Sequence, residues 1–391
     1  MQLVPIAAVA HEILTGIPLR FGVRDQDGNM LLARGFMVQS ERTREGLLAR
    51  GVFVDMDELG AEAEAIAPPP ETPLQTFIRT WDRLHDSMGM VLRATAPTQL
   101  DAIRIMECAC RVISLCESSP SLLIFLILRH DQTRYKDYGV FHSLHVAAVC
   151  GLIARRLKWS DDDRFSLVAA GLTMNLAMTE LQGGLAIQRQ PPTEAQRQTI
   201  HGHPLEAAAL LRQIGIADEK WLSAIEQHHE IAGGGGYPMQ VRTPTVMSQV
   251  LRYIDIFIAK LSARATRLAE LPNLAARQLF MAHRADPLAA AVIKEFGIYP
   301  PGCYVKLASG ELAIVTRGGA NANTPVVAAL TNADGYALVE PVRRDTSKVE
   351  HAIEEILGEN AVFVRPSWSR LHALSFGHAD RPVADMSHVT I

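Results

Sequence analysis

The sequence predicts a mainly α-helical protein, with a small α/β module before the helical core and a small β-rich appendage after it. Three observations lead to this prediction. Between residues 74 and 298 apolar side chains recur at helical spacing. The segments on either side contain short strand-like runs separated by turn residues. A run of three prolines near residue 70 cannot lie inside a helix and is typical of a linker.

The composition limits the class of protein. With 391 residues, 48% of them hydrophobic and 20% charged, the chain can bury a sizeable core, which excludes wholesale disorder. The formal net charge of −4 gives no general attraction to nucleic acid or to an anionic membrane, so neither is expected as a partner. The longest aliphatic run, residues 122–128, is shorter than the about 20 residues of a bilayer span. The first residues, MQLVPIAAVAHEIL, lack the basic segment of a signal peptide, so a cytoplasmic location is expected.

The first module is expected to cover residues 1–60. Short strand-like runs at residues 17–23, 29–32 and 52–54 surround one helix, and Asp27-Gly28 is a typical hairpin turn. Residues 61–73 are the expected linker.

The helical core is expected to cover residues 74–298. One face of its first helix carries apolar side chains at 3-4-4-4 spacing, namely Phe77, Trp81, Leu84, Met88 and Leu92. Further helices are expected over residues 140–158, 222–230 and 248–268, and Thr193-x-x-Gln196 resembles a capping box. Residues 165–179 contain no formal charge, which predicts an uninterrupted helix buried on all sides.

The β-rich appendage is expected over residues 299–365. Its strands are predicted at residues 303–307, 312–316, 326–330 and 336–341, and a helix is predicted over residues 349–357. Residues 366–391 lack periodicity and are expected to form a flexible tail.

Six histidines occur in three close pairs, which are His142 and His145, His201 and His203, and His228 and His229. The last pair precedes four consecutive glycines and then Tyr237-Pro238. Glycine allows positive φ or close backbone approach, and proline restricts the residue before it, so a formed turn is expected here.

Asp255 lies in an apolar run, VLRYIDIFIAKL. A carboxylate near an apolar face is costly unless it is paired or bound to a cation. It is therefore a ligand, the partner of Arg252 three residues back, or a solvent-facing residue, and the residues alone leave these readings open.

Several segments resemble the HD-GYP family, a group of helical, metal-dependent phosphodiesterases whose characterised members hydrolyse cyclic di-GMP. The segment HHEIAGGGGYP is similar to the signature HHExxDGxGYP, and FHSLHVA, HGHPLEAAALL and RYIDIFIAKLSAR are similar to other family segments. The resemblance implies an HD-type helical core. It implies metal ligands at His142, His203, His228, His229 and Asp255. It also implies phosphate binding by Arg264, and contact with a GGDEF-domain protein through the loop of Gly236, Tyr237 and Pro238.

The chain departs from the family at the HDxGK segment, which here reads AAGLTMNLAMTEL. The metal-binding histidine falls on Met174, the bridging aspartate on Asn175 and the lysine on Met178, while the aspartate of the signature falls on Gly233. A thioether is a poor ligand for magnesium, manganese or ferric iron. Conceivable substitutes for the lost ligands are Glu107, Glu117 and Asp131.

These departures favour a degenerate HD-GYP protein that acts as a regulatory module in cyclic di-GMP signalling, with no metal or a weakly held divalent or iron ion. One alternative is an active metal-dependent phosphodiesterase with a rearranged site. Another is a receptor that binds cyclic di-GMP or another nucleotide without cleaving it, through Arg252, Lys260 and Arg264. A homodimer through the helices of residues 74–116 is a further expectation.

Overall fold

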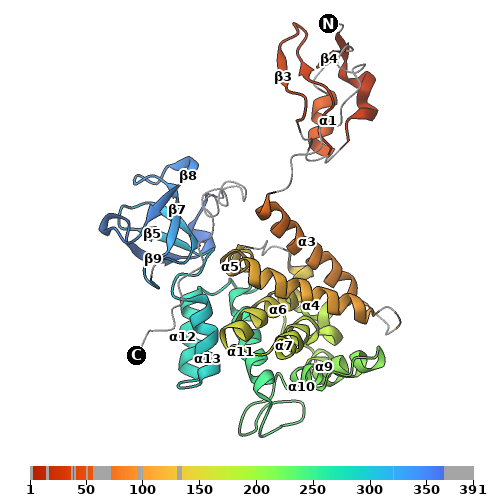
Figure 1. Cartoon of the computed structure of the whole chain (residues 1–391), viewed down its shortest axis with the longest axis vertical. Coiled ribbons are helices and arrows are strands. Elements are labelled where there is room, and N and C mark those ends of the chain that lie inside the picture. The colour runs from red at the N-terminus through yellow and green to blue at the C-terminus, as the bar shows by residue number, and fades with distance from the viewer. Residues whose placement is uncertain are drawn as a thin grey trace. The chain divides into compact units, whose positions relative to one another are not determined.

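The computed structural model contains two compact units, Met1–Thr76 and Phe77–Ile391 (Figure 1). The structure describes residues 3–14, 17–36, 38, 41–49, 52–55, 72–94, 98, 100–129, 134–319 and 321–364. Residues 61–71 of the expected linker and the expected tail, residues 366–391, lie outside this range.

The first unit is a four-stranded antiparallel sheet with one α-helix. Its strands are β1 (Leu3–Pro5), β2 (Val23–Arg24), β3 (Met30–Leu32) and β4 (Phe53–Asp55), in the order β1-β4-β2-β3, and its helices are η1 (Ile6–Glu12) and α1 (Glu41–Ala49). The core includes Ile6, Ile13, Phe21 and Val54. The expected α/β module is therefore present. Its first strand was not predicted, and the run at residues 17–23 is a strand only at its end.

The second unit contains most of the helices. They are α3 (Pro73–Leu92), α4 (Ala102–Ser118), α5 (Pro120–Arg129), α6 (Tyr138–Arg156), α7 (Asp161–Thr173), α8 (Thr179–Ile187), α9 (Glu194–Gln213), α10 (Glu219–Glu226), α11 (Val246–Leu261), α12 (Pro272–Ala282) and α13 (Pro287–Phe296), with short η3 (Tyr135–Asp137) and η4 (Leu176–Met178). The prediction of a mainly α-helical protein is confirmed.

Helix α6 forms the centre of the helical part, and nearly all of its residues are buried. Two glycines allow close packing around it. A Cβ on Gly151 would lie 2.7 Å from Cys116 Sγ of α4, and a Cβ on Gly171 of α7 would lie 2.9 Å from Ala147 Cα. The segment Tyr135–Arg156 is long and apolar enough to cross a membrane, but 94% of its most apolar window is buried within the fold. That burial is the property of a core helix.

The prediction of one uninterrupted helix over residues 165–179 is wrong. Helix α7 ends at Thr173, and α8 begins only at Thr179. The intervening Asn175 and Met178 have φ values of −105° and −135°, outside the range of a regular α-helix. The absence of charge correctly indicated burial, but it carries no information on the backbone path.

Two other helices are shorter than predicted. Helix α10 ends at Glu226 rather than at residue 230, and α11 ends at Leu261 rather than at residue 268. The capping box before α9 is confirmed, because Thr193 and Gln196 exchange both of its hydrogen bonds.

The C-terminal region is a five-stranded antiparallel sheet. Its strands are β5 (Tyr304–Leu307), β6 (Leu312–Arg317), β7 (Val326–Thr331), β8 (Ala337–Asp345) and β9 (Ile353–Leu357), in the order β8-β7-β6-β5-β9. The four predicted strands are present. The helix predicted over residues 349–357 is wrong, because only η5 (Val349–His351) is helical and β9 pairs with β5. That pairing joins segments nearly 50 residues apart, so local sequence could not indicate it.

The sheet is attached to the helical part through α5. Phe125 packs with Tyr304, Ile314 and Leu330 of the sheet. Arg129 lies 4.6 Å above the Tyr304 ring and forms an ion pair of 2.8 Å with Glu359, near η6 (Glu359–Ala361).

Candidate metal centre

Three histidines lie together between α9 and the end of α10. His203 is on α9, and His228 and His229 directly follow α10. One ligand nitrogen from each side chain lies within 4.8 Å of the others. His203 and His228 are fully buried and His229 is half-buried.

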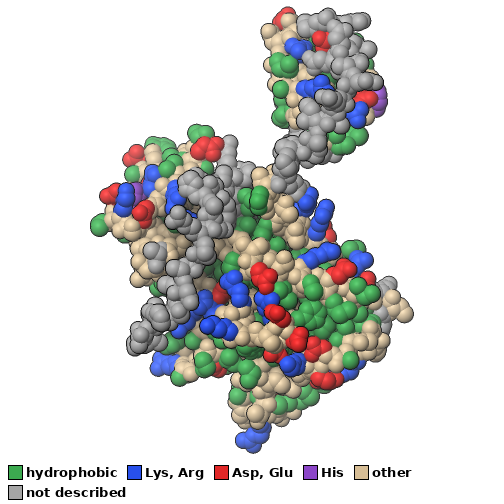
Figure 2. Space-filling view, in the orientation of Figure 1, with side chains coloured by type: hydrophobic (Ala, Val, Ile, Leu, Met, Phe, Trp, Pro, Cys, Tyr) green, Lys and Arg blue, Asp and Glu red, His purple; other side chains and the backbone are tan. Residues whose placement is uncertain are grey.

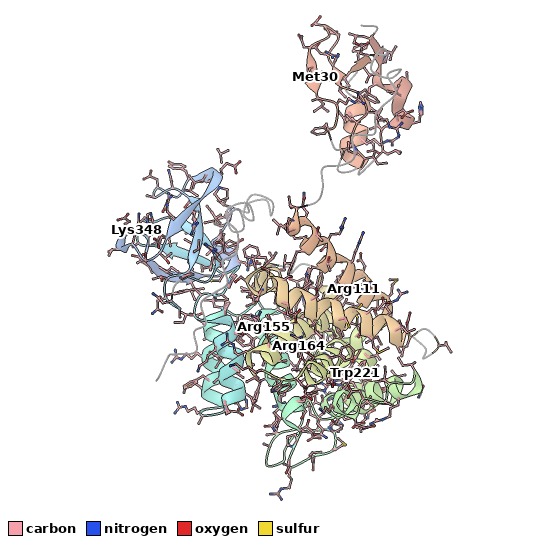
Figure 3. All side chains as sticks on the ribbon, viewed as in Figure 1. Met30, Arg111, Arg155, Arg164, Trp221 and Lys348 are labelled. Carbon is pink, nitrogen blue, oxygen red and sulfur yellow. The ribbon has the colours of Figure 1, made fainter. Side chains whose placement is uncertain are left out.

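Two contacts fix the first turn of α10, the helix that leads to His228. Its N-terminus is capped by Asp218, which accepts hydrogen bonds from the backbone N–H groups of Lys220 and Trp221. The indole Nε1 of Trp221 (Figure 3) donates to Thr173 Oγ1 at 2.9 Å, at the end of α7. The helix that delivers the two histidines is thereby tied to the segment containing Asn175.

Backbone carbonyls set the tautomers of two of the histidines. His203 Nδ1 donates to Ile200 O, and His228 Nδ1 donates to Ile225 O, each at 2.6 Å. In the neutral rings the Nε2 atoms then carry lone pairs, and these two atoms lie 3.2 Å apart. Two facing lone pairs repel unless a cation lies beside them. This arrangement fits a metal ion, for which neutral imidazole nitrogen is a common ligand.

Protonation does not remove this repulsion, because burial opposes it. Burial lowers the pKa of His203 to about 3, and the neighbouring His228 lowers it further. Burial likewise lowers the pKa of His229 to about 2 and shifts the pKa of His228 downward. All three rings are therefore neutral near pH 7 and available as ligands.

A second pair of candidate ligands joins α6 and α11. His142 Nε2 donates to Asp255 Oδ1 at 2.7 Å, and their side chains are 2% and 15% exposed. Burial would raise the pKa of Asp255, but the hydrogen bond from His142 outweighs this effect and holds the pKa below its ordinary value. Within the described residues, Asp255 is hydrogen-bonded to His142 and forms no ion pair with Arg252.

A cavity of about 240 Å³ brings most of the predicted site residues together. It is lined by Tyr138, His142, Asn175, Met178, Gln182, Leu185, Ile200, His229, Tyr237, Asp255, Ala259 and Arg264. Asp255 is the one carboxylate and Arg264 the one permanent cation among these lining residues. Met174, in contrast, is fully buried and does not line the cavity.

Two side-chain amides leave acceptors in this cavity without partners. The Oδ1 atom of Asn175 and the Oε1 atom of Gln182 are buried and accept no hydrogen bond within the described part of the chain. A buried acceptor without a partner is costly, and both oxygens are neutral ligands that a cation or a ligand N–H group could satisfy. No sequence motif indicated Gln182, which lines the cavity because the first turn of α8 reaches it.

The break before α8 approaches α6 closely. A Cβ on Gly139 would lie 2.5 Å from the carbonyl oxygen of Thr179, so a larger residue would force the two segments apart. This contact holds Asn175 and Met178 near His142, one turn further along α6.

The four glycines belong to a formed loop. The buried Glu230 carboxylate accepts hydrogen bonds from Met239 N at 2.7 Å and from Val241 N at 3.0 Å, which closes the loop. Gly233, Gly234 and Gly235 have φ values of +91°, +99° and +94°, the conformation that favours glycine. A Cβ on Gly236 would lie 2.4 Å from Glu230 Cα, so only glycine fits there.

Tyr237 faces the metal centre. Its ring stacks between His229 and His201, with centroid distances of 4.5 Å and 5.1 Å, and it lines the cavity. Gly236 is buried and Pro238 is half-buried, whereas Met239 is 43% exposed. Met239 therefore faces outward, as does Ile231, which is 40% exposed, and sequence reasoning singled out neither residue.

Arg264 reaches the cavity beside Tyr138. Its Nη2 donates to the Tyr138 hydroxyl at 3.3 Å, and its guanidinium lies 5.2 Å from the centre of that ring. Lys260 and Arg252 do not line the cavity, and Lys260 forms an ion pair with Glu270.

The substitutes considered for the lost ligands are not brought to the cavity. Glu107 forms an ion pair with Arg111 on α4, and Glu117 forms one with Arg164. Asp131 lies outside the described residues.

Comparison with known proteins identifies an HD domain over residues 121–285. A cyclic di-GMP phosphodiesterase of Pseudomonas aeruginosa is 24% identical over 201 residues, which cover 48% of this chain and 49% of that protein. A 3'3'-cGAMP-specific phosphodiesterase of Vibrio cholerae is 28% identical over 176 residues, which cover 44% of this chain and 38% of that protein. The chain thus spans half or less of the length of these curated relatives.

The solved structure of an HDG"Y"P protein from Bdellovibrio bacteriovorus is also similar, with a TM-score of 0.47 and 13% identity over 74% of this chain and 97% of that one. The segment matched as an HD domain contains all five predicted ligands and the loop of Gly236, Tyr237 and Pro238. Residues 121–285 therefore match the HD domain family, and the resemblance of the signature segments to HD-GYP proteins lies within this matched part of the chain.

Proposed function

We propose that this chain is a regulatory module of cyclic dinucleotide signalling, whose HD site holds at most one metal ion and does not hydrolyse a phosphodiester at a useful rate. One observation carries the proposal. Asp255 is the single carboxylate in the cavity wall, and the neutral Asn175 and Met178 lie where the family signature has its bridging aspartate and its lysine.

The donor set suits one metal ion. Ring nitrogens of His203, His228 and His229 would hold this ion. His142 and Asp255 are the two remaining candidate ligands. A bound metal ion would supply Lewis-acid polarisation and lower the pKa of a coordinated water. The carbonyls of the two isoleucines keep the histidine Nε2 atoms directed at the centre, and Tyr237 covers one side of His229.

Hydrolysis is disfavoured for an electrostatic reason. In two-metal sites the cations lie about 3.5–4 Å apart and together stabilise the attacking and leaving oxygens. Their mutual repulsion is offset by bridging carboxylate charge. Asn175 can supply an oxygen ligand but no negative charge. Asp255, the single carboxylate of the cavity wall, already accepts a hydrogen bond from His142.

The ligand class that we propose is a cyclic dinucleotide, because the relatives are named as phosphodiesterases of cyclic di-GMP and 3'3'-cGAMP. The cavity of about 240 Å³ is smaller than the about 300–1,000 Å³ of typical ligand pockets. It therefore suits one phosphate and its metal rather than the entire dinucleotide. Arg264 is the cation that would contact this phosphate.

A direct test is cyclic di-GMP turnover by the full chain after loading with manganese or iron. We expect calorimetry to detect cyclic di-GMP binding, without multiple-turnover release of a linear product.

The alternative, an active phosphodiesterase with a rearranged site, is favoured by the three-histidine cluster. Steady turnover that is lost in His228→Ala would establish this alternative and overturn the proposal.

Two partner proposals accompany this function. A GGDEF-domain protein would contact the loop that carries Tyr237, through the exposed Met239. A homodimer would form through α3 and α4, where Met90 is 59% and Ile103 66% exposed and Figure 2 shows hydrophobic side chains at the surface. A cytoplasmic location is also part of the proposal.

A further inference from the structure

A second cavity, of about 600 Å³, lies in the C-terminal sheet region and contains none of the metal-centre residues. Basic side chains line it from the end of β8 through η5, namely Arg343, Arg344, Lys348 and His351. Gly319 and Thr324, between β6 and β7, form part of the opposite wall. Its size is within the about 300–1,000 Å³ range of small-ligand sites.

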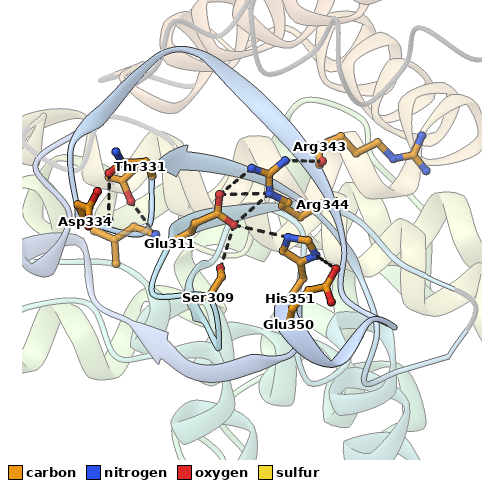
Figure 4. A network of polar contacts seen from close by, with 10 residues as sticks. Ser309, Glu311, Thr331, Asp334, Arg343, Arg344, Glu350 and His351 are labelled. Atoms are coloured by element: carbon orange, nitrogen blue, oxygen red, sulfur yellow. Dashed lines mark hydrogen bonds and ion pairs between the residues drawn. The ribbon is translucent and has the colours of Figure 1, made fainter.

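Arg344 is held rigidly in this cavity (Figure 4). It donates to Glu311 through Nη2 at 2.7 Å and through Nε at 3.0 Å, and Ser309 Oγ donates to the same carboxylate at 2.9 Å. His351 Nε2 lies 3.8 Å from Glu311, whose side chain is only 7% exposed. The buried Glu311 therefore orders two of the basic groups that line the cavity.

Arg343 and Lys348 are different, because neither forms an ion pair with another described residue. Figure 4 shows the Arg343 side chain extending away from Glu311. Asp345, the carboxylate among the lining residues, accepts hydrogen bonds from Ser347 N at 3.0 Å and Ser347 Oγ at 2.7 Å. Asp345 keeps its negative charge, and the hydrogen bonds from Ser347, together with the nearby Lys348 and Arg343, hold its pKa below the ordinary value. Two exposed cations thus face one carboxylate, because Glu311 already offsets Arg344, and the lining keeps an excess of positive charge.

We propose that this cavity binds the phosphate group of a ligand. Like charges in one cavity repel, and an anion relieves that repulsion. The guanidinium of Arg343 offers a planar pair of N–H donors, which matches phosphate oxygens, and the Lys348 ammonium adds a mobile point charge. The charge of the ordered Arg344 is offset by Glu311, so Arg343 and Lys348 supply the excess positive charge. This site is independent of the proposed function, because it shares no residue with the metal centre.

The test uses the full chain and the variant Arg343→Gln/Lys348→Gln. Binding of pyrophosphate and of ATP is measured by calorimetry, and binding to phosphatidylglycerol-containing vesicles is measured by sedimentation. The control variant Lys294→Gln/Lys306→Gln removes the same charge from exposed positions outside the cavity. Thermal melting of both variants confirms that they are folded.

Loss of a charge-assisted hydrogen bond is expected to weaken binding about tenfold or more per cation. Pyrophosphate or ATP binding that is weakened in the cavity variant but not in the control identifies a soluble phosphate ligand. Vesicle binding with the same pattern identifies a lipid headgroup. The proposal is overturned if no probe binds below about 1 mM, or if binding is the same in both variants.

Discussion

At the scale of single residues, the backbone partners of the histidines determine what the centre can bind. Ile200 O and Ile225 O each accept a hydrogen bond from an Nδ1–H group, so the Nε2 atoms of His203 and His228 face one another unprotonated. The adjacent cavity is lined by His229 and by Asn175, whose Oδ1 atom has no hydrogen-bond partner in the described chain. The site therefore offers several neutral ligands and, among the residues that line the cavity, the single carboxylate of Asp255.

The first prediction concerns the negative charge that Asn175 does not supply. In the variant Met174→His/Asn175→Asp/Met178→Lys, the restored carboxylate should offset the repulsion between two metal ions. We expect cyclic di-GMP turnover to rise at least about tenfold above the wild type, equivalent to about 1.4 kcal/mol of barrier. The variant Met174→His/Met178→Lys is the control, since it lacks the carboxylate. Equal rates in both variants would mean that the charge at residue 175 is not the limiting feature.

At the scale of elements, the glycine loop keeps its shape through one close backbone contact. Gly236→Ala would place a Cβ 2.4 Å from Glu230 Cα. A Cβ at Gly184, an exposed position of α8, would meet nothing within 4 Å. We expect Gly236→Ala to reduce the free energy of unfolding by about 1–3 kcal/mol. Gly184→Ala should increase it by about 0.5–1 kcal/mol. Urea denaturation measures both, and equal stability of the two variants would contradict this account of the loop.

The second element-scale prediction concerns Glu311 in the C-terminal sheet. Hydrogen bonds from Arg344 hold the pKa of Glu311 below its ordinary value. A carboxylate with a lowered folded-state pKa stabilises the protein above its unfolded pKa of about 4.3, and this contribution disappears as the pH falls through the folded-state value. Glu311→Gln should therefore lower the melting temperature at pH 7, with a smaller difference near pH 4. A difference independent of pH would show that packing, not charge, is responsible.

At the scale of the whole molecule, the fold turns the loop of Tyr237 inward and leaves Met239 outside. If the loop contacts a GGDEF-domain protein, Met239→Asp should reduce capture of a purified GGDEF-domain diguanylate cyclase at least about tenfold, since a buried charge at an interface is costly. Met281→Asp, at a methionine that is 52% exposed on α12, is the matched control. Unchanged capture of the cyclase by the Met239→Asp variant would show that this loop is not the contact surface.

Much of this arrangement could be predicted from the sequence. The mainly α-helical core and four strands of the C-terminal sheet follow from local periodicity, which records which face of an element is buried. The interruption at Asn175 and the pairing of β9 with β5 could not be predicted, because each depends on contacts with distant segments. The ligand positions came from motif resemblance. Their pairing, such as that of His142 with Asp255, required the fold.

The most direct test of the central claim is the metal content of the purified full chain, measured by inductively coupled plasma mass spectrometry after growth with added iron and manganese. The account predicts at most one metal ion per chain, which is lost in His228→Ala and retained in His11→Ala, a substitution of an exposed histidine. Two tightly held metal ions per chain would contradict the claim that a centre with the single carboxylate of Asp255 cannot support a two-metal site.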